Sequence, residues 1–218
     1  SKMFNFAESR QLRTRGSNPV RHVQRNPEIS RDRFLSNKEF QRLATTLVEL
    51  ERSGEEDERV INLLRMYLYT GLRRSELLTL EWRFVDFEDR CLRLPDTKTG
   101  FKLVYLGSSA ITLLERLPRR KGNPYVFPGD VEDGHFIAIN KAWNRIRVAA
   151  DLADVRLHDL RRSWGSIGAR NGMSLLMIGK AMGHKTTKAT EIYARISDDA
   201  RRDATEAITS RIEELLAG

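Results

Sequence analysis

The 218-residue chain has very few of the residues on which redox and metal sites depend. It contains one cysteine, Cys91, and four histidines. A single thiol excludes a disulfide within the chain and is typical of a protein from a reducing compartment. The sequence also lacks a P-loop, an HExxH motif, a Cys/His cluster and an acidic constellation for two-metal hydrolysis. We therefore expect neither a metal nor any other cofactor.

Long apolar runs are missing as well. The longest stretch without a formal charge, Leu103–Leu114, contains Gly107, Ser108 and Ser109. A membrane span needs about 18–20 apolar residues, so this stretch is too short. No charged-then-apolar leader opens the chain. These features predict a soluble, cytoplasmic protein with no membrane partner.

Positive charge is abundant and unevenly distributed. The net charge is +8, which suits a polyanionic partner, although a merely basic soluble protein would look the same by this measure. Residues 1–42 hold ten Lys and Arg against four Asp and Glu, and residues 158–188 hold six against one. The excess charge therefore lies in an amino-terminal arm and in one later segment.

The organisation of the chain changes near residue 34. Residues 1–33 have no sustained apolar period and are rich in Arg, Asn, Ser and Pro, which predicts an extended linker. The globular part then begins with a predicted capping box of Ser36 and Glu39.

The apolar pattern beyond this point is mostly helical. From Val85 to Leu106 it changes to short alternating runs, which predict about three antiparallel strands. We predict a fold that is mainly α with a small antiparallel β-sheet (α+β). The second predicted helix carries an apolar stripe from Val60 to Leu68 and is ended by Gly71. The other predicted helices cover Ser36–Arg52, Ser75–Leu80, Ser109–Leu117, Ile139–Ala150, His158–Arg170, Ser174–Met182, Thr187–Ala194 and Asp198–Leu216.

A set of reactive side chains is scattered along this pattern. It combines two arginines, a lysine, two histidines and a late tyrosine, namely Arg73, Lys98, His158, Arg161, His184 and Tyr193. Guanidiniums are planar and always charged, so they suit the extra charge on a phosphodiester under attack. A phenol oxygen is a nucleophile that could make that attack.

Each of these residues has an ordinary interpretation when it is taken alone. Arg73 could be a solvated residue at a helix end, and the pair His158 and Arg161 could lie on a helix surface. Lys98 could be a solvated turn residue. Tyr193 could belong to the core, because Ile192 and Ala194 flank it. The motifs that surround these residues decide between the two interpretations.

Those motifs resemble the catalytic domain of the tyrosine recombinases, the family of phage integrases and Xer-type recombinases. The likeness rests on TGLRRSE at 70–76, HDLRR at 158–162, and MGH at 182–184 followed nine residues later by Tyr193. Met182 and Trp164 replace the more common Leu and Phe of these motifs. The resemblance covers residue 34 to about residue 205.

The resemblance implies site-specific DNA recombination without a cofactor, in a phage or another mobile element. Tyr193 would attack a DNA phosphate to form a 3′-phosphotyrosine, and the free 5′ hydroxyl of a partner duplex would then attack that linkage. The resemblance implies that Arg73, Arg161 and His184 hold the phosphate, while His158 and Lys98 move protons. Lys102 is a weaker candidate for the role of Lys98.

Two further expectations concern this chemistry. The resemblance implies that Glu76 braces the arginines and transfers no proton. The pKa of a phenol is near 10, and we expect nearby guanidiniums to favour the phenolate of Tyr193.

The resemblance also implies partners and a domain plan. Residues 1–33 would be a linker or arm from a missing amino-terminal DNA-binding domain, and 34–196 the catalytic domain. Residues 197–218 would form a carboxy-terminal helix that packs either on its own domain or on a neighbouring protomer. Expected partners are double-stranded DNA and three further copies in a tetramer, with accessory DNA-bending proteins left open. The alternative functions are a type IB topoisomerase and a catalytically inactive DNA-binding domain.

Overall fold

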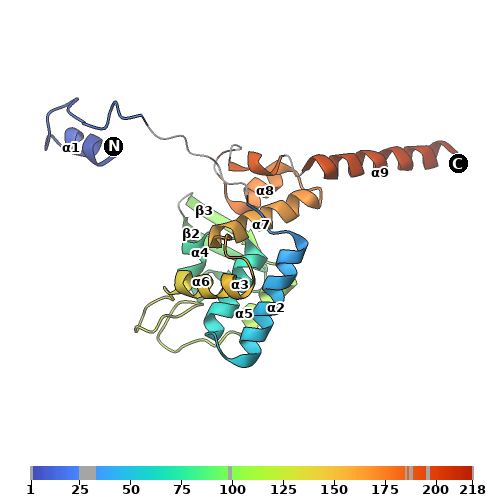
Figure 1. The fold of residues 1–218 in the computed structure, drawn as a ribbon, viewed down its shortest axis with the longest axis horizontal. Coiled ribbons are helices and arrows are strands. Elements are labelled where there is room, and N and C mark those ends of the chain that lie inside the picture. The colour runs from blue at the N-terminus through green and yellow to red at the C-terminus, as the bar shows by residue number, and fades with distance from the viewer. Residues whose placement is uncertain are drawn as a thin grey trace. The chain divides into compact units, whose positions relative to one another are not determined.

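The computed structural model describes residues 2–24, 33–97, 100–184, 186, 189–194 and 197–217. The chain divides into two compact units, Ser1–Asp32 and Arg33–Gly218. Figure 1 shows the elements of both units in chain order.

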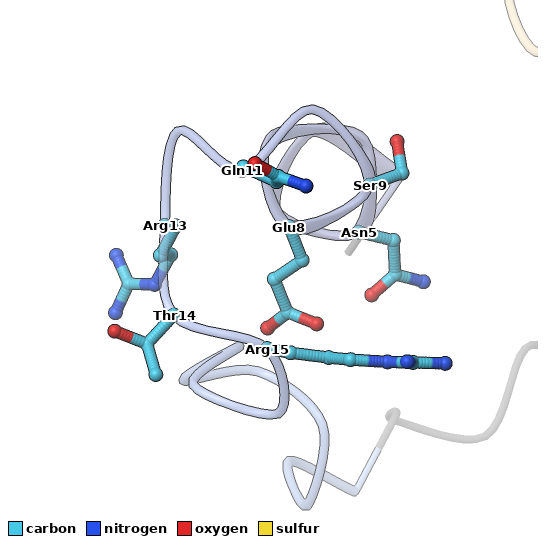
Figure 2. A pocket seen from close by; sticks show the side chains of 7 residues that line it. All are labelled: Asn5, Glu8, Ser9, Gln11, Arg13, Thr14 and Arg15. Carbon is cyan, nitrogen blue, oxygen red and sulfur yellow. The ribbon is translucent and has the colours of Figure 1, made fainter.

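The first unit contains a helix, α1 (Lys2–Ser9). The prediction of an extended segment was therefore wrong for these residues. Two cation–π contacts hold the short helix to the chain after it, with Arg10 over Phe6 and Arg13 over Phe4. Such contacts leave no sustained apolar period in the sequence, which is why the sequence pattern did not predict this helix. This unit contains a hollow of about 760 Å³. Figure 2 shows the side chains that line it, which are Asn5, Glu8, Ser9, Gln11, Arg13, Thr14 and Arg15.

In the second unit the first two helices begin and end at local sequence signals. α2 (Asn37–Ser53) starts at the predicted capping box, in which the Ser36 side chain accepts from the Glu39 N–H and Glu39 accepts from the Ser36 N–H. α3 (Glu58–Thr70) ends at Gly71, whose φ of 58° is left-handed. A Cβ on Gly71 would lie 2.8 Å from the Trp164 ring, so this position needs glycine for its space as well as for its backbone conformation.

The other helices follow the predicted order, with bounds that differ by a few residues. They are α4 (Arg74–Leu78), α5 (Ser108–Arg116), α6 (Ile139–Ala149), α7 (Leu157–Arg170), α8 (Leu175–Met182) and α9 (Ser197–Ala217). The 3₁₀ helices η1 (Trp82–Phe84) and η3 (Glu191–Tyr193) are also present. The predicted helix at 187–194 is wrong for the described part of that segment, where Ala189 and η3 are 3₁₀ and Thr190 lies in a turn between them.

The sheet consists of β1 (Val85–Asp86), β2 (Cys91–Thr97) and β3 (Gly100–Tyr105), antiparallel and in that order. Alternation along β3 buries Lys102 and Val104 and exposes Phe101 and Tyr105. The predicted fold class, mainly α with a small antiparallel sheet, is confirmed.

Helix α3 lies at the centre of the main core and contacts α2, α4, α5 and α7. A second, smaller cluster joins α7 and α8 to η3 and contains Ala169, Ile178, Met182 and Tyr193. The reactive residues that the structure describes lie near the ends of α3, α7, α8 and η3. Within the described part of the chain, no helix is both long and apolar enough to cross a membrane.

Candidate active site

Arg73 stands in extended backbone between the end of α3 and the start of α4. Its guanidinium donates to Glu76 Oε1 at 2.6 Å and to the carbonyl oxygen of Gly183 at 2.8 Å. The backbone N–H of Arg73 also donates to Glu76 Oε2, at 3.0 Å. The carboxylate of Glu76 therefore holds both the side chain and the main chain of Arg73.

Glu76 has a second cation beside it. Lys102 Nζ lies 3.1 Å from Glu76 Oε2, and the two residues are only 6% and 8% exposed. Burial by itself would raise the pKa of the Glu76 carboxyl, but the charge of Lys102 and hydrogen bonds from Arg73 outweigh burial and lower it. Burial lowers the pKa of Lys102 to about 8, against the opposing effect of Glu76. Lys98, the lysine predicted for the site, lies outside the described residues.

Arg161 projects from α7 and is 2% exposed. It donates to the carbonyl oxygens of Gly71 and Met182, at 2.5 Å for the latter. These carbonyls belong to the ends of α3 and α8, so Arg161 connects the two helix ends. Glu76 thus contacts Arg73 directly, whereas Arg161 is held by backbone carbonyls. Burial and the charge of Arg73 lower the pKa of Arg161, although a guanidinium stays charged.

His184 follows Gly183, which ends α8 in a left-handed conformation with φ of 68°. The His184 N–H donates to the Gly179 carbonyl at 2.9 Å, so the start of this loop is fixed to the helix. Its ring Nδ1 lies 2.9 Å from Thr190 Oγ1. Burial and the charges of Arg161 and Arg73 lower the pKa of His184 from 6.5 to about 4. The imidazole is therefore neutral at pH 7.

His158 lies one helical turn before Arg161 on α7, and much of its side chain is exposed. Partial burial of the ring, followed by the charges of Arg162 and Arg161, lowers its pKa. The charges of Arg73, Lys102 and His158 also act on the pKa of His184, which places these side chains around one point.

Tyr193 lies in η3 and is 1% exposed. Its ring packs against α7, where a Cβ on Gly165 would be 2.5 Å from Tyr193 Cζ, and the Phe34 ring centre is 5.9 Å away. Burial raises the pKa of Tyr193 to about 12, although Arg161 and Arg162 act in the opposite direction. Arg161 and Arg162 therefore favour the phenolate, as expected, but the loss of hydration outweighs them and the phenol stays neutral.

The structure also shows residues that the sequence motifs did not single out. Thr190 binds His184, and Gly165 provides the space for the Tyr193 ring. The burial of Lys102 could have been predicted from the alternation along the strand, because Lys102 lies on the same inward face of β3 as Val104. The contacts of Thr190 and Gly165 depend on how η3 packs, which no local pattern reports.

Among the described residues, one group of side chains lies close enough together to suit a metal ion: Asp86, Asp89 and Cys91. Both carboxylates already bind the guanidinium of Arg93. The thiol is buried, which raises its pKa and disfavours the thiolate that a metal would need. This group therefore has the character of an ion-paired β-turn.

Comparison with known proteins shows which family this chain belongs to. The model of the phage integrase family matches residues 33–200. Tyrosine recombinase XerC of Xanthomonas axonopodis is 30% identical over 160 residues, which are 70% of this chain and 52% of the relative. Prophage integrase IntF of Escherichia coli is 31% identical over 137 residues, which are 61% of this chain and 29% of the relative. The chain thus spans about half, or less, of the length of these relatives.

Solved structures show the same fold. XerA recombinase matches with a TM-score of 0.62 and 22% identity over 93% of this chain and 70% of that one. The Tn1549 transposon integrase, solved with transposon right end DNA, matches with a TM-score of 0.66 and 18% identity over 85% of this chain and 68% of that one. The chain adopts the tyrosine recombinase catalytic-domain fold and belongs to the phage integrase family.

Proposed function

We propose that this chain is the catalytic part of a site-specific DNA recombinase that cleaves and rejoins strands through a 3′-phosphotyrosine at Tyr193. The observation that carries the proposal is the anchoring of Arg73 and Arg161 to the carbonyls of Gly71, Met182 and Gly183 around the neutral His184. Membership of the phage integrase family supports it. We further propose that the chain acts on DNA in the cytoplasm.

The two guanidiniums are suited to hold the scissile phosphate. Each has five N–H donors, and the contacts to carbonyls and to Glu76 use only some of them. The remaining donors can bind the non-bridging oxygens, on which negative charge accumulates as the phosphorus becomes five-coordinate. The neutral His184 would add one donor without adding repulsion between cations.

Proton movements follow from the bonds that change. When Tyr193 Oη bonds to phosphorus, the phenol proton must leave, and His158 can accept it because its lowered pKa keeps it neutral near pH 7. When the bond to the 5′ oxygen breaks, that oxygen takes a proton, which we assign to Lys98. The buried Lys102, with a pKa of about 8, is the alternative donor.

The nucleophile must also change its position. Tyr193 is buried against Gly165 as a neutral phenol. We propose that the ring turns toward Arg161 when DNA is bound, since attack requires contact with the phosphate that the guanidiniums hold. The buried arrangement would then be the resting state.

Double-stranded DNA and further copies of the chain are the proposed partners. The XerH recombinase, a structural neighbour with a TM-score of 0.62, was solved bound to a palindromic difH substrate. In α9 the apolar residues Ile208, Ile212, Leu215 and Leu216 are 51–82% exposed. We propose that this face packs on a neighbouring protomer in a tetramer on DNA.

Covalent capture tests the proposed function. The chain is incubated with a pool of random-sequence double-stranded DNA, denatured in detergent, and the DNA that stays attached is sequenced. We expect attached DNA ending in a 3′ phosphate at a shared sequence, and none with Tyr193→Phe, which lacks the nucleophilic oxygen.

Two outcomes separate the alternatives. If neither protein captures DNA although both bind it, the chain is an inactive DNA-binding domain. If the wild type captures DNA but only reseals the original strand in a two-duplex assay, it acts as a type IB topoisomerase.

A further inference from the structure

His184 makes one side-chain contact that the proposed mechanism does not use. Its Nδ1 lies 2.9 Å from the hydroxyl oxygen of Thr190, six residues further along the chain. A neutral imidazole carries a proton on one ring nitrogen only, and a hydroxyl can either donate or accept. The direction of this hydrogen bond therefore decides which ring nitrogen carries the proton, and so whether the ring can donate to a phosphate.

Thr190 is held firmly enough to impose that choice. It is 3% exposed, and its hydroxyl oxygen would lie only 3.0 Å from a Cβ built on Gly179 of α8. Its carbonyl accepts the N–H of Tyr193 at 3.0 Å, which forms the turn of η3. Thr190 thus contacts the helix that precedes His184, the His184 ring and the segment that carries the nucleophile.

We infer that Thr190 is a positioning residue for DNA cleavage. Its hydroxyl donates to Nδ1 of His184 and so holds the imidazole as the Nε2–H tautomer, the form that can donate to a phosphate oxygen. This inference rests on the proposed role of His184 in phosphate binding. The opposite tautomer would present a lone pair at Nε2, which repels an anionic oxygen.

The surroundings favour this role over a purely structural one. His184 and Thr190 line a cavity of about 250 Å³ together with Leu175, Leu176 and Gly179. Lys180, Thr186 and Glu191 also line this cavity, but among the described residues the hydrogen-bond partner of Nδ1 is the hydroxyl of Thr190. The mainly apolar surroundings strengthen that bond. Gly179 leaves the space that this hydroxyl occupies.

The first experiment reads the tautomer directly. The chain is labelled with ¹⁵N-histidine, and long-range ¹H–¹⁵N correlations are recorded at pH 7.5 with and without inorganic phosphate. The signal of His184, one of four histidines, is assigned with His184→Gln. We expect an unprotonated Nδ1 and a protonated Nε2 in the wild type and in Thr190→Ser. In Thr190→Val, which keeps the shape but lacks the hydroxyl, we expect a mixture of tautomers.

The second experiment connects the tautomer to the reaction. On the DNA captured by the wild type, Thr190→Val should slow covalent complex formation about tenfold at saturating DNA, the effect of losing one hydrogen bond. Thr190→Ser should stay within about threefold of the wild type, because it keeps the donor. In a His184→Ala background Thr190→Val should have no further effect. Thr186→Val, which removes an exposed hydroxyl from the same cavity, is the matched control.

Several results would overturn the inference. They are a protonated Nδ1 in the wild type, an unchanged tautomer in Thr190→Val, and an equal loss of rate with or without His184. If the wild type captures no DNA, the proposed function fails on its own, while the spectra still decide whether Thr190 sets the tautomer.

Discussion

The two halves of the candidate site differ in how firmly the protein holds them. In the phosphate-binding half, Arg73, Arg161 and His184 are each tied to other side chains or to helix-end carbonyls. In the nucleophile half, the Tyr193 hydroxyl makes no hydrogen bond to any residue that the structure describes, and only packing holds the ring.

This difference has a chemical meaning. Donors that are already oriented stabilise a transition state without a reorganisation cost during the reaction, so a fixed phosphate-binding half is suited to catalysis. A buried phenol with a pKa of about 12 is a poor nucleophile. The comparison therefore suggests that binding and attack are separate steps, and that only the second requires a movement.

The largest expected effect comes from removing a fixed donor. Arg73→Ala should slow covalent complex formation at least about a hundredfold, because one preorganised charge is lost. Arg161→Ala should do the same and also lower stability, since the Gly71 and Met182 carbonyls lose their donor. Single-turnover kinetics and chemical denaturation measure the two effects.

The neighbouring Arg74 provides the control for this prediction. Arg74 is exposed and donates to Asn140, outside the site. Arg74→Ala should leave cleavage within about threefold of the wild type, since it removes only an exposed surface contact. An equal loss from Arg74→Ala and Arg73→Ala would mean that general positive charge, and not the fixed geometry, is what matters.

The second prediction concerns the nucleophile half. Gly165→Ala places a Cβ 2.5 Å from Tyr193 Cζ, so the ring must leave its buried position. We expect a loss of about 1–3 kcal/mol in the free energy of unfolding, as for overpacked cores. Because the proposed reaction requires the tyrosine to leave this position, we expect cleavage to become a few times faster than in the wild type.

Gly168→Ala on the same helix is the matched control. Its Cβ would lie 3.2 Å from Met173 Sδ and 3.3 Å from Ile178 Cγ1, looser than the 2.5 Å contact at Gly165, and alanine favours the helix by about 1 kcal/mol over glycine. The loss of stability should therefore be smaller than for Gly165→Ala. If Gly165→Ala were as stable as Gly168→Ala, the packing of Tyr193 against Gly165 would not exist in solution.

The sequence predicts the phosphate-binding half better than the nucleophile half. The capping box at Ser36 and the helix end at Gly71 are local signals, and each has the expected structural counterpart. The motifs also name Arg73 and Arg161. Residues near in sequence or held by a helix end can be predicted in this way, because the backbone geometry fixes them.

The contact between Thr190 and His184 could not be predicted, and the sequence left the burial of Tyr193 as one of two interpretations. Both depend on how η3 packs across α7 and α8, which is a tertiary arrangement without a period of its own. The same reason explains why a helix was predicted at 187–194. Helix α1 was missed for another reason, because its cation–π contacts leave no apolar period in the sequence.

The third prediction concerns α9, which follows the nucleophile segment in the chain. Ile208→Asp with Ile212→Asp places two charges on its exposed apolar face. Exposed substitutions change stability by no more than about 0.5 kcal/mol each, so the melting temperature should change little. Strand exchange between two duplexes should fall about tenfold, because contacts between protomers are lost.

Ser210→Asp, on the opposite face of α9, is the control and should exchange strands like the wild type. The number of protomers on DNA is measured by light scattering. A large fall in melting temperature with unchanged assembly would show that α9 packs on its own domain. The nucleophile half would then be controlled within one protomer.

The smallest expected effect returns to the phosphate-binding half and comes from His184. Its pKa is about 4 in the folded protein against an ordinary 6.5, so the unfolded chain binds more protons between these values. Stability is therefore lost as the pH falls from 6.5 to 4. Since the ring is only half buried, solvent screening limits the loss to about 1 kcal/mol. Urea unfolding at pH 7 and pH 4.5 should show His184→Gln losing less stability than the wild type. Parallel losses in the two proteins would mean that neither burial nor the neighbouring cations lower the pKa of this ring.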